Sequence, residues 1–376
     1  MKKNQKLLVT IGVAIVVVAV AIVVCCNKSG SIVSNEVLIG AILPLTGDFA
    51  FEGEKAAKAI MLAEAEINNS SSNKHVKVLL EDGKFTSKDS LFAYNRLMMK
   101  RVDGIISFGT PCTGAIKSKV AQDKIPMMAI DGTIGVPQSS PWIFRCLQTT
   151  VSVGNAVAAY LNSTSAIRNC ALFYMQGDSG DDFAKGVKGV YTGKILGEEL
   201  FSYDSKDSRA SIQKLISLNS DCICVFGYGM GYSTALNQLI ELGYRGLVVT
   251  DMNVTSILDK LRNNGDGIKY VSLDFGNASE NEKSKDFIKR LGEQYNCEPT
   301  SFSAFAYEAV RLMSVPVGQT NNDIRNSISR NILGTREYYS VVGVITYQND
   351  GELSIPFSLY SIQNGKECFE RKIQTP

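Results

Sequence analysis

Short apolar runs and longer amphipathic stretches alternate along most of the chain. Residues 37–43 (VLIGAIL) and 104–108 (GIISF) are apolar runs of strand length, and turn residues follow each of them. Between them, the stretch GEKAAKAIMLAEAEINN places Ala56, Ile60 and Ala63 on one face at helical spacing. Strands separated by helices form parallel sheets with helices on both faces, so the pattern predicts an α/β fold.

The alternation occurs in two successive series, separated by a long helical stretch at about 153–161. The second series contains the apolar runs CALFYM, CICVF and LVVT, again with amphipathic stretches between them. The chain ends in segments 341–353 and 357–370, whose Asn-Asp-Gly and Asn-Gly turns predict hairpins. Two series predict two α/β lobes, and ligands of such sheets bind beyond the carboxyl ends of the strands.

The N-terminus carries the clearest local signal. A basic segment, MKKNQK, precedes an uncharged apolar run of roughly 20 residues that ends at Cys25 and Cys26. This arrangement is similar to a bacterial lipoprotein signal, with Cys25 or Cys26 as the lipidated residue. The residue before the lipidated cysteine is not the small residue that such signals prefer, and the apolar run is long for a signal. An uncleaved anchor helix is therefore the alternative. Both alternatives make residues 1–26 a signal or anchor and residues 27–36 a tether, with the globular part outside the cell membrane.

Composition and charge narrow the class of protein. Of 376 residues, 45% are hydrophobic and 20% are charged, which is typical of a globular chain long enough for two domains. A net charge of +2 gives no basic excess for binding nucleic acid. The single histidine, His75, stands beside a strand start, where nothing suggests Ser-His-Asp catalysis. The acidic stretch 177–182 (GDSGDD) reads as a polar loop, so we predict neither an enzyme nor a metal site.

The cysteines give no disulfide framework. Seven of the nine follow the N-terminal segment, which is an odd number, and their spacings are irregular. Cys222 and Cys224 share one face of a predicted strand. We expect them to be buried thiols rather than a metal or redox pair.

A glycine-rich stretch, GYGMG at 227–231, follows a strand and precedes a helix. About twenty residues later a second apolar run ends in Asp251, which is the layout of a dinucleotide-binding unit. The glycines are spaced G-x-G-x-G rather than G-x-G-x-x-G, and they lie deep in the second series. The sequence therefore predicts no cofactor here.

Four segments, taken in order, resemble the type I periplasmic binding proteins. Within that family they resemble the leucine/isoleucine/valine-binding branch, the substrate-binding subunits of ABC importers. The similarity covers nearly all of residues 36–365. The segments are 39–68 with its P-x-T-G loop, 103–133, 225–244 and 285–313.

The resemblance implies a fold of two doubly wound parallel-sheet lobes joined by three crossover segments. The N-lobe would comprise residues 37–149 and 278–345. The C-lobe would comprise residues 150–277 and 346–376.

The resemblance also implies a ligand site between the lobes. We expect Thr113 to open a helix, where free backbone N–H groups favour a ligand carboxylate. Thr133 matches the family's second hydroxyl position, and the backbone of Cys112 and Gly132 would approach the ligand. Helix capping is the alternative role of Thr113.

The C-lobe would supply the remaining contacts. Asp251 matches the family's acidic position for a ligand ammonium group, and Tyr228 matches the residue that covers the ligand. Thr150 stands where the amino-acid binders often have an acid. Glu52 or Asp131 could supply the missing charge, and Phe302 and Phe51 are candidates for an apolar wall.

These features predict an extracytoplasmic solute-binding protein. It would capture a small polar ligand, an amino acid or a relative, by lobe closure and deliver it unaltered to an ABC permease. The alternative is a membrane-anchored sensor domain of the same fold that acts through a partner protein.

Overall fold

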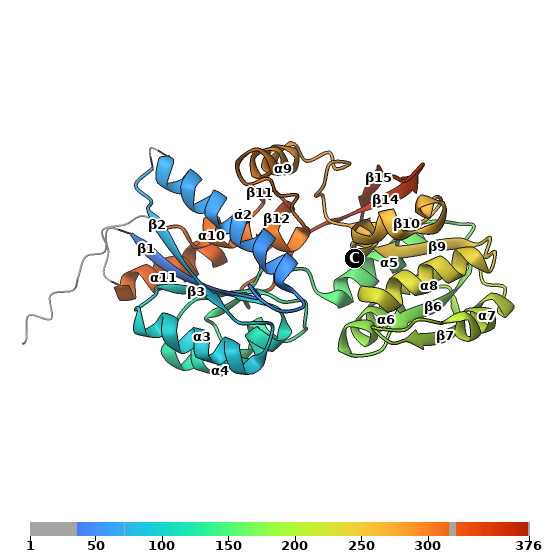
Figure 1. Cartoon of the computed structure of the whole chain (residues 1–376), viewed down its shortest axis with the longest axis horizontal. Coiled ribbons are helices and arrows are strands. Elements are labelled where there is room, and N and C mark those ends of the chain that lie inside the picture. Colours follow the sequence, from blue (N-terminus) through green and yellow to red (C-terminus); the bar gives the residue numbers. More distant parts are fainter. Residues whose placement is uncertain (1–35, 71, 316–320, 375–376) are drawn as a thin grey trace, which may run out of the picture.

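The computed structural model describes residues 36–374, except for residue 71 and residues 316–320. Within this range the chain forms two α/β lobes side by side, with the elements from β1 to β5 (residues 37–145) in one lobe and those from α5 to β10 (residues 150–272) in the other (Figure 1). The expected α/β class and the two-lobed architecture are confirmed.

The N-lobe is built on a parallel sheet of five strands in the order β2-β1-β3-β4-β5. The strands are β1 (Val37–Leu43), β2 (Val76–Asp82), β3 (Gly104–Phe108), β4 (Met127–Ile130) and β5 (Ile143–Arg145). The helices of this lobe are α2 (Ala50–Asn69), α3 (Ser87–Met99), α4 (Thr110–Asp123), α9 (Glu282–Tyr295), α10 (Ser301–Met313) and α11 (Asn321–Leu333), with the short helix η1 (Pro137–Ser139).

The C-lobe contains a sheet of seven strands in the order β15-β14-β10-β9-β8-β6-β7. Its strands are β6 (Asn169–Met175), β7 (Lys194–Phe201), β8 (Cys222–Phe226), β9 (Leu247–Asp251), β10 (Lys269–Ser272), β14 (Phe357–Gln363) and β15 (Lys366–Ile373). Its helices are α5 (Thr150–Asn162), α6 (Asp178–Val190), α7 (Arg209–Ser217), α8 (Gly229–Glu241), η2 (Met252–Lys260) and η3 (Arg262–Gly265). The last two strands are an antiparallel hairpin at the sheet edge, as the Asn-Gly turn predicts.

A small third sheet corrects one expected lobe boundary. The strands β11 (Tyr338–Ser340), β12 (Gly343–Tyr347) and β13 (Leu353–Ser354) pair with one another. They are held to the N-lobe, because the Tyr347 hydroxyl donates to the Arg145 carbonyl at 2.6 Å and the Arg145 N–H donates to the Gly351 carbonyl at 3.0 Å. The boundary expected after residue 345 falls inside β12, and the N-lobe instead extends to about residue 354.

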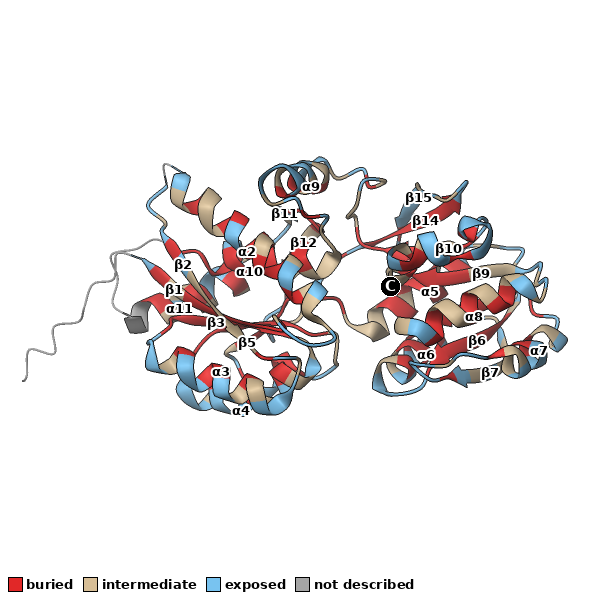
Figure 2. Ribbon diagram, in the orientation of Figure 1, coloured by how far each residue is buried: buried red, intermediate tan, exposed pale blue. Residues whose placement is uncertain are grey.

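The strands form the centre of both lobes (Figure 2). Every residue of β3, β4 and β8 is buried, as expected for parallel strands covered on both faces. Cys222 and Cys224 are buried as predicted, with their sulfur atoms 3.9 Å apart. The seven cysteines of the described residues are all free, and His75 is exposed.

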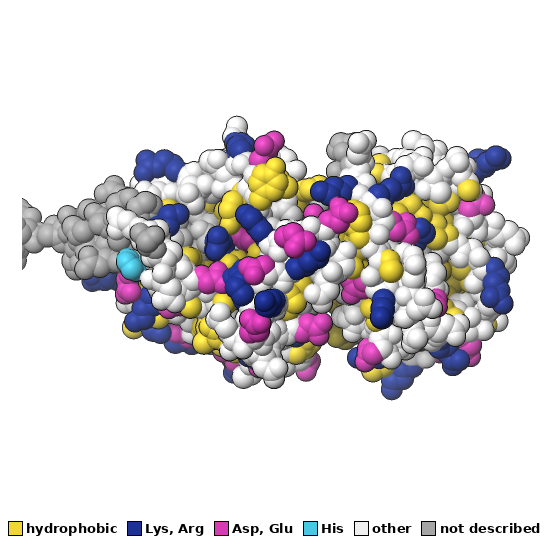
Figure 3. Space-filling model, turned by 90° about the horizontal axis from the view of Figure 1, so that it is seen from above, with side chains coloured by type: hydrophobic (Ala, Val, Ile, Leu, Met, Phe, Trp, Pro, Cys, Tyr) yellow, Lys and Arg dark blue, Asp and Glu magenta, His cyan; other side chains and the backbone are white. Residues whose placement is uncertain are grey.

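The surface carries no large region of one charge on the face shown in Figure 3, where basic and acidic side chains are interspersed. No helix in the described part of the chain is both long and apolar enough to cross a membrane. The N-terminal apolar run, including Cys25 and Cys26, lies outside the described residues, so the lipidation and anchor predictions stay predictions.

Candidate ligand-binding site

A cavity of about 240 Å³ lies between the two lobes, at the carboxyl ends of their central strands. Residues from β4 and the helices α2 and α10 line it on the N-lobe side. Residues that follow β8 and β9, together with the first turn of α6, line it on the C-lobe side. The cavity therefore lies where ligands of parallel sheets are expected to bind.

Asp131 follows β4 and is only 2% exposed. Its Oδ1 atom accepts hydrogen bonds from the Thr110 hydroxyl at 3.1 Å and from the Thr133 backbone N–H at 2.9 Å. Its Oδ2 atom is buried and has no hydrogen-bond partner. A buried acceptor without a partner is costly, so this oxygen is suited to a donor on a bound ligand.

Asp251 ends β9 on the opposite lobe and is 3% exposed. Its Oδ2 atom accepts from the Asn253 side chain at 2.7 Å, while its Oδ1 atom is buried without a partner. Burial disfavours the charged form and raises the pKa of Asp251 to about 8, although nearby backbone N–H groups and Thr250 oppose the shift. Asp251 therefore takes up a proton at a higher pH than an exposed carboxyl group does.

Glu52 lies in the first turn of α2 and also lines the cavity. Burial raises its pKa, and the Thr300 hydroxyl opposes this shift by donating to Glu52 Oε2 at 2.6 Å.

Gln148 lies in the segment that leads from β5 to α5 and is 6% exposed. Its side-chain oxygen is a third buried acceptor without a partner.

Aromatic rings make up much of the cavity wall. Phe302, at the start of α10, packs against Phe108 with ring centroids 5.7 Å apart. Tyr228 is 38% exposed and meets the ring of Tyr203 edge to face at 5.8 Å. The other rings that line the cavity are Phe49, Phe51, Phe85 and Phe226.

Two of the predicted site residues, Cys112 and Thr113, do not line the cavity. Helix α4 begins at Thr110, three residues before Thr113, and Gly109 is its N-cap. Thr113 is fully buried, and its hydroxyl pairs with that of Ser107 at 2.9 Å. Cys112 is buried as well, at 2% exposure, so neither side chain reaches the cavity surface.

Thr110 takes the place expected for Thr113. The sequence held the signal for this earlier start, since Gly109 and Pro111 flank Thr110 and proline is favoured in the first turn of a helix. Gly109 has a φ of 79°, and a Cβ there would lie 2.3 Å from the ring of Phe85. Glycine is therefore required where the strand turns sharply into the helix.

The other predicted residues line the cavity: Glu52, Asp131, Gly132, Thr133, Thr150, Tyr228, Asp251, Phe302 and Phe51. Thr150 is the first residue of α5, and its backbone N–H lies 3.4 Å from the Gly132 carbonyl. Sequence reasoning assigned no role to three further lining residues, Asp178, Ser179 and Asp182, which lie at the start of α6.

The glycines of GYGMG have a packing role. A Cβ on Gly231 would lie 2.0 Å from the Ser202 carbonyl, and one on Gly229 would lie 2.3 Å from the ring of Tyr203. These glycines let the start of α8 lie against the segment that follows β7, and this packing positions Tyr228 at the cavity.

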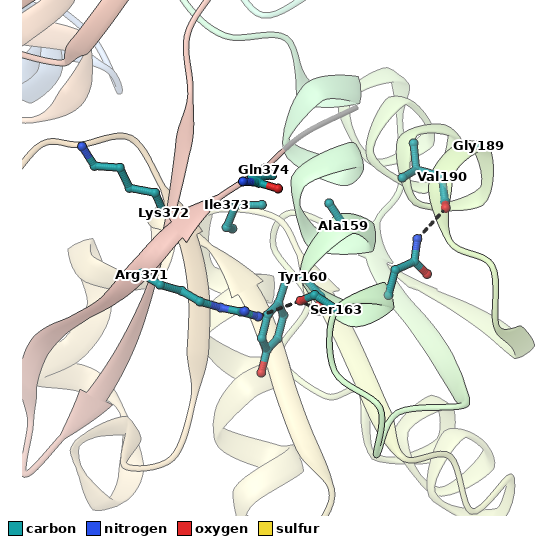
Figure 4. Close-up of a pocket in the computed structure, with 10 residues that line it drawn as sticks. Ala159, Tyr160, Ser163, Gly189, Val190, Arg371, Lys372, Ile373 and Gln374 are labelled. Atoms are coloured by element: carbon teal, nitrogen blue, oxygen red, sulfur yellow. Dashed lines mark hydrogen bonds between the residues drawn. The ribbon is translucent and has the colours of Figure 1, made fainter.

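A second hollow, of about 1050 Å³, lies on the C-lobe between α5, the end of α6 and β15 (Figure 4). Several of its polar groups form hydrogen bonds within the lobe. Arg371 donates to the Ser163 hydroxyl at 2.7 Å and lies over the Tyr160 ring, while the Asn162 side chain donates to the Val190 carbonyl at 2.8 Å. None of the unpartnered buried side-chain atoms found in the described residues lies in this hollow.

Known proteins resemble this chain over almost its whole length. The sequence pattern of a family described as periplasmic binding protein matches residues 36–367. A Leu/Ile/Val-binding protein homologue from Brucella melitensis is 23% identical over 345 residues, which are 88% of this chain and 92% of that protein.

Solved structures share the fold. The branched-chain amino acid transporter substrate-binding protein LivJ from Streptococcus pneumoniae, in complex with isoleucine, has a TM-score of 0.76 and 20% identity. That comparison covers 89% of this chain and 99% of LivJ. A solute-binding protein of an ABC transporter from R. palustris, in complex with benzoate, has a TM-score of 0.76 and 17% identity, over 90% of this chain and 97% of that one. The family match over most of the sequence, together with the two-lobed parallel-sheet fold, shows that this chain belongs to the periplasmic binding proteins of type I.

Proposed function

We propose that this protein is an extracytoplasmic solute-binding protein that captures a small ligand between its lobes and delivers it to an ABC permease. The observation that carries the proposal is the cavity, which both lobes line and in which buried acceptors from both lobes lack partners. A ligand that satisfied acceptors on both sides would hold the lobes together. Solute-binding relatives with bound isoleucine and benzoate support a small ligand of this size class.

Capture would occur by closure of the lobes around the ligand. The chain passes between the lobes after β5, after β10 and after β13, and these segments could act as the hinge. The ligand shifts the population towards the closed state by its difference in affinity for the two states. A ligand with micromolar affinity has about 8 kcal/mol of binding free energy for contacts and closure together.

We expect replacement of Tyr228 by alanine to remove most of the ligand response. In the full chain, a ligand at 100 times its Kd should raise the free energy of unfolding by about 2.7 kcal/mol. Tyr228→Ala deletes a ring that covers the cavity, so a much smaller thermal shift is expected in a screen of amino acids, amides, amines and carboxylates. Tyr339→Ala is the control, because that ring is exposed and lies outside the cavity. Equal responses in both variants would remove Tyr228 from the site.

We also propose that the N-terminal segment holds the protein at the outer face of the cell membrane. Lipidation at Cys25 or Cys26 is the favoured form and a retained apolar helix is the alternative. Mass spectrometry of the mature protein distinguishes them. An acylated N-terminal cysteine is expected, whereas an intact Met1 would contradict lipidation and support the retained helix.

A further inference from the structure

We propose that the ligand of the inter-lobe cavity is an organic cation with an apolar body, such as a primary amine, and that it has no free carboxylate. This inference rests on the proposed function, since it specifies the ligand class of the same cavity. It departs from the amino-acid ligand that the family resemblance implies.

The charges that line the cavity are of one sign. The described residues that line the cavity include no lysine, arginine or histidine. They include five carboxyl groups, those of Glu52, Asp131, Asp178, Asp182 and Asp251. Arg145 lies near the N-lobe side, but its guanidinium is bonded to Glu352 and to the carbonyls of Asp131 and Thr133. A carboxylate on the ligand would enter this cavity without a cationic partner.

Donors at Thr110 and Thr133 on the N-lobe are already paired within the protein. The Thr110 hydroxyl and the Thr133 N–H both donate to Asp131 Oδ1, and the two threonine hydroxyls lie 3.0 Å apart. Helix N-termini favour anions. The N-termini of α4 and α6 at the cavity already have carboxyl groups of the protein beside them, Asp131 at α4 and Asp178 at α6.

The buried side-chain atoms in the cavity that lack a partner are all oxygens, which accept hydrogen bonds once the carboxyl groups are ionised. Asp131 Oδ2, Gln148 Oε1 and Asp251 Oδ1 are buried without partners, and each residue is more than nine-tenths buried. The hydroxyls of Thr150, Ser179 and Tyr228 can accept as well as donate, so they suit ligands of either charge. An ammonium group has three donors and no acceptor, so it can donate a hydrogen bond to each of the three oxygens that lack a partner.

The aromatic wall suits the rest of such a ligand. Rings from both lobes, including Phe302 and Tyr228, offer apolar area, and their faces attract a cation. A volume of about 240 Å³ lies below the usual range of roughly 300–1,000 Å³ for ligand pockets, which favours a compact molecule.

The test compares ligands that differ only in charge. The full chain, purified in detergent, is titrated by calorimetry at pH 8 with two matched sets of compounds. One set is leucine, isoamylamine and isocaproate, and the other is phenylalanine, phenethylamine and hydrocinnamate. In each set the amine lacks the carboxylate of the amino acid and the acid lacks its ammonium group. We expect the amine of at least one set to bind about tenfold more tightly than its two partners.

Variants tie the preference to the cavity. Asp251→Asn keeps the shape of the side chain and removes its charge, so amine affinity should fall about tenfold or more. Asp259→Asn, an exposed carboxyl group outside the cavity, should leave amine affinity unchanged. The unfolding midpoint of each variant without ligand shows that it is folded.

The outcomes separate the two proposals. Tighter binding of an amino acid or an acid than of its matched amine overturns the cation inference and leaves solute capture standing. Unchanged amine affinity in Asp251→Asn also overturns the inference. Binding of none of the six compounds overturns the cation inference, and a thermal shift with another compound of the wider screen would leave solute capture standing.

Discussion

Replacement of Arg145 by methionine is expected to lower the free energy of unfolding by about 3–5 kcal/mol. Arg145 is fully buried and forms an ion pair with Glu352, 207 residues away in sequence. Its guanidinium also donates to the carbonyls of Asp131 at 2.5 Å and Thr133 at 2.8 Å. The substitution would leave the carbonyl oxygens of Asp131 and Thr133 without this donor and the Glu352 carboxylate with only the Gln138 amide, and each such loss is costly.

The matched control is Arg96→Met. Arg96 donates to Glu81 at 2.7 Å, but its side chain is half exposed, so a loss of at most about 1 kcal/mol is expected. Urea denaturation of both variants measures the difference. Similar losses in the two would show that the Arg145 network does not hold the β12–β13 hairpin to β5. Because Arg145 also holds the segment 131–133, its loss should weaken ligand binding as well.

The strand and helix pattern was enough to place the cavity, but not to place every side chain in it. Asp131 was predicted to face the cleft because it directly follows an apolar run, and parallel strands end at one edge of a sheet. Asp251 and Tyr228 also follow apolar runs, but their roles came from the family resemblance. All three residues line the cavity.

Where prediction fell short, the cause was a contact between distant parts of the chain or a small shift in an element boundary. The start of α4 differs by three residues from the expected one, which moved the cavity contact from Thr113 to Thr110. The hydrogen bonds that occupy the Asp131 carboxyl join two different strand ends, so no local pattern reveals them. The pairing of Arg145 with Glu352 fixes the lobe boundary and is equally invisible in the sequence.

The stability of the empty protein is expected to fall as the pH rises through neutrality. Burial raises the pKa of Asp251 to about 8 and that of Asp103 to about 6, from an ordinary value of 3.8. The folded state therefore holds protons that the unfolded state has released, and the stabilisation they give is complete below about pH 4. Above about pH 4 the stabilisation declines, until about pH 6 for Asp103 and until about pH 8 for Asp251. The free energy of unfolding falls by at most about 1.4 kcal/mol per pH unit for each group.

Denaturation at a series of pH values measures this loss. Asp251→Asn should flatten the decline over the whole range from about pH 4 to 8, whereas Asp103→Asn should flatten it only between about pH 4 and 6. Tyr232 interacts electrostatically with Asp251, but burial raises the pKa of Tyr232 well above its ordinary value, so it stays neutral in this range. An unchanged decline in Asp251→Asn would show that another group titrates.

Binding of a cation should reverse this trend. An ammonium group beside Asp251 favours the ionised carboxyl, so an amine that binds at pH 7 should release up to one proton. Its affinity should therefore rise with pH until about pH 8, the pKa of the empty site. Calorimetry in two buffers with different ionisation enthalpies counts the protons. Proton uptake on binding would mean that Asp251 acts as a protonated donor, and it would point to an acceptor, such as a carboxylate, on the ligand.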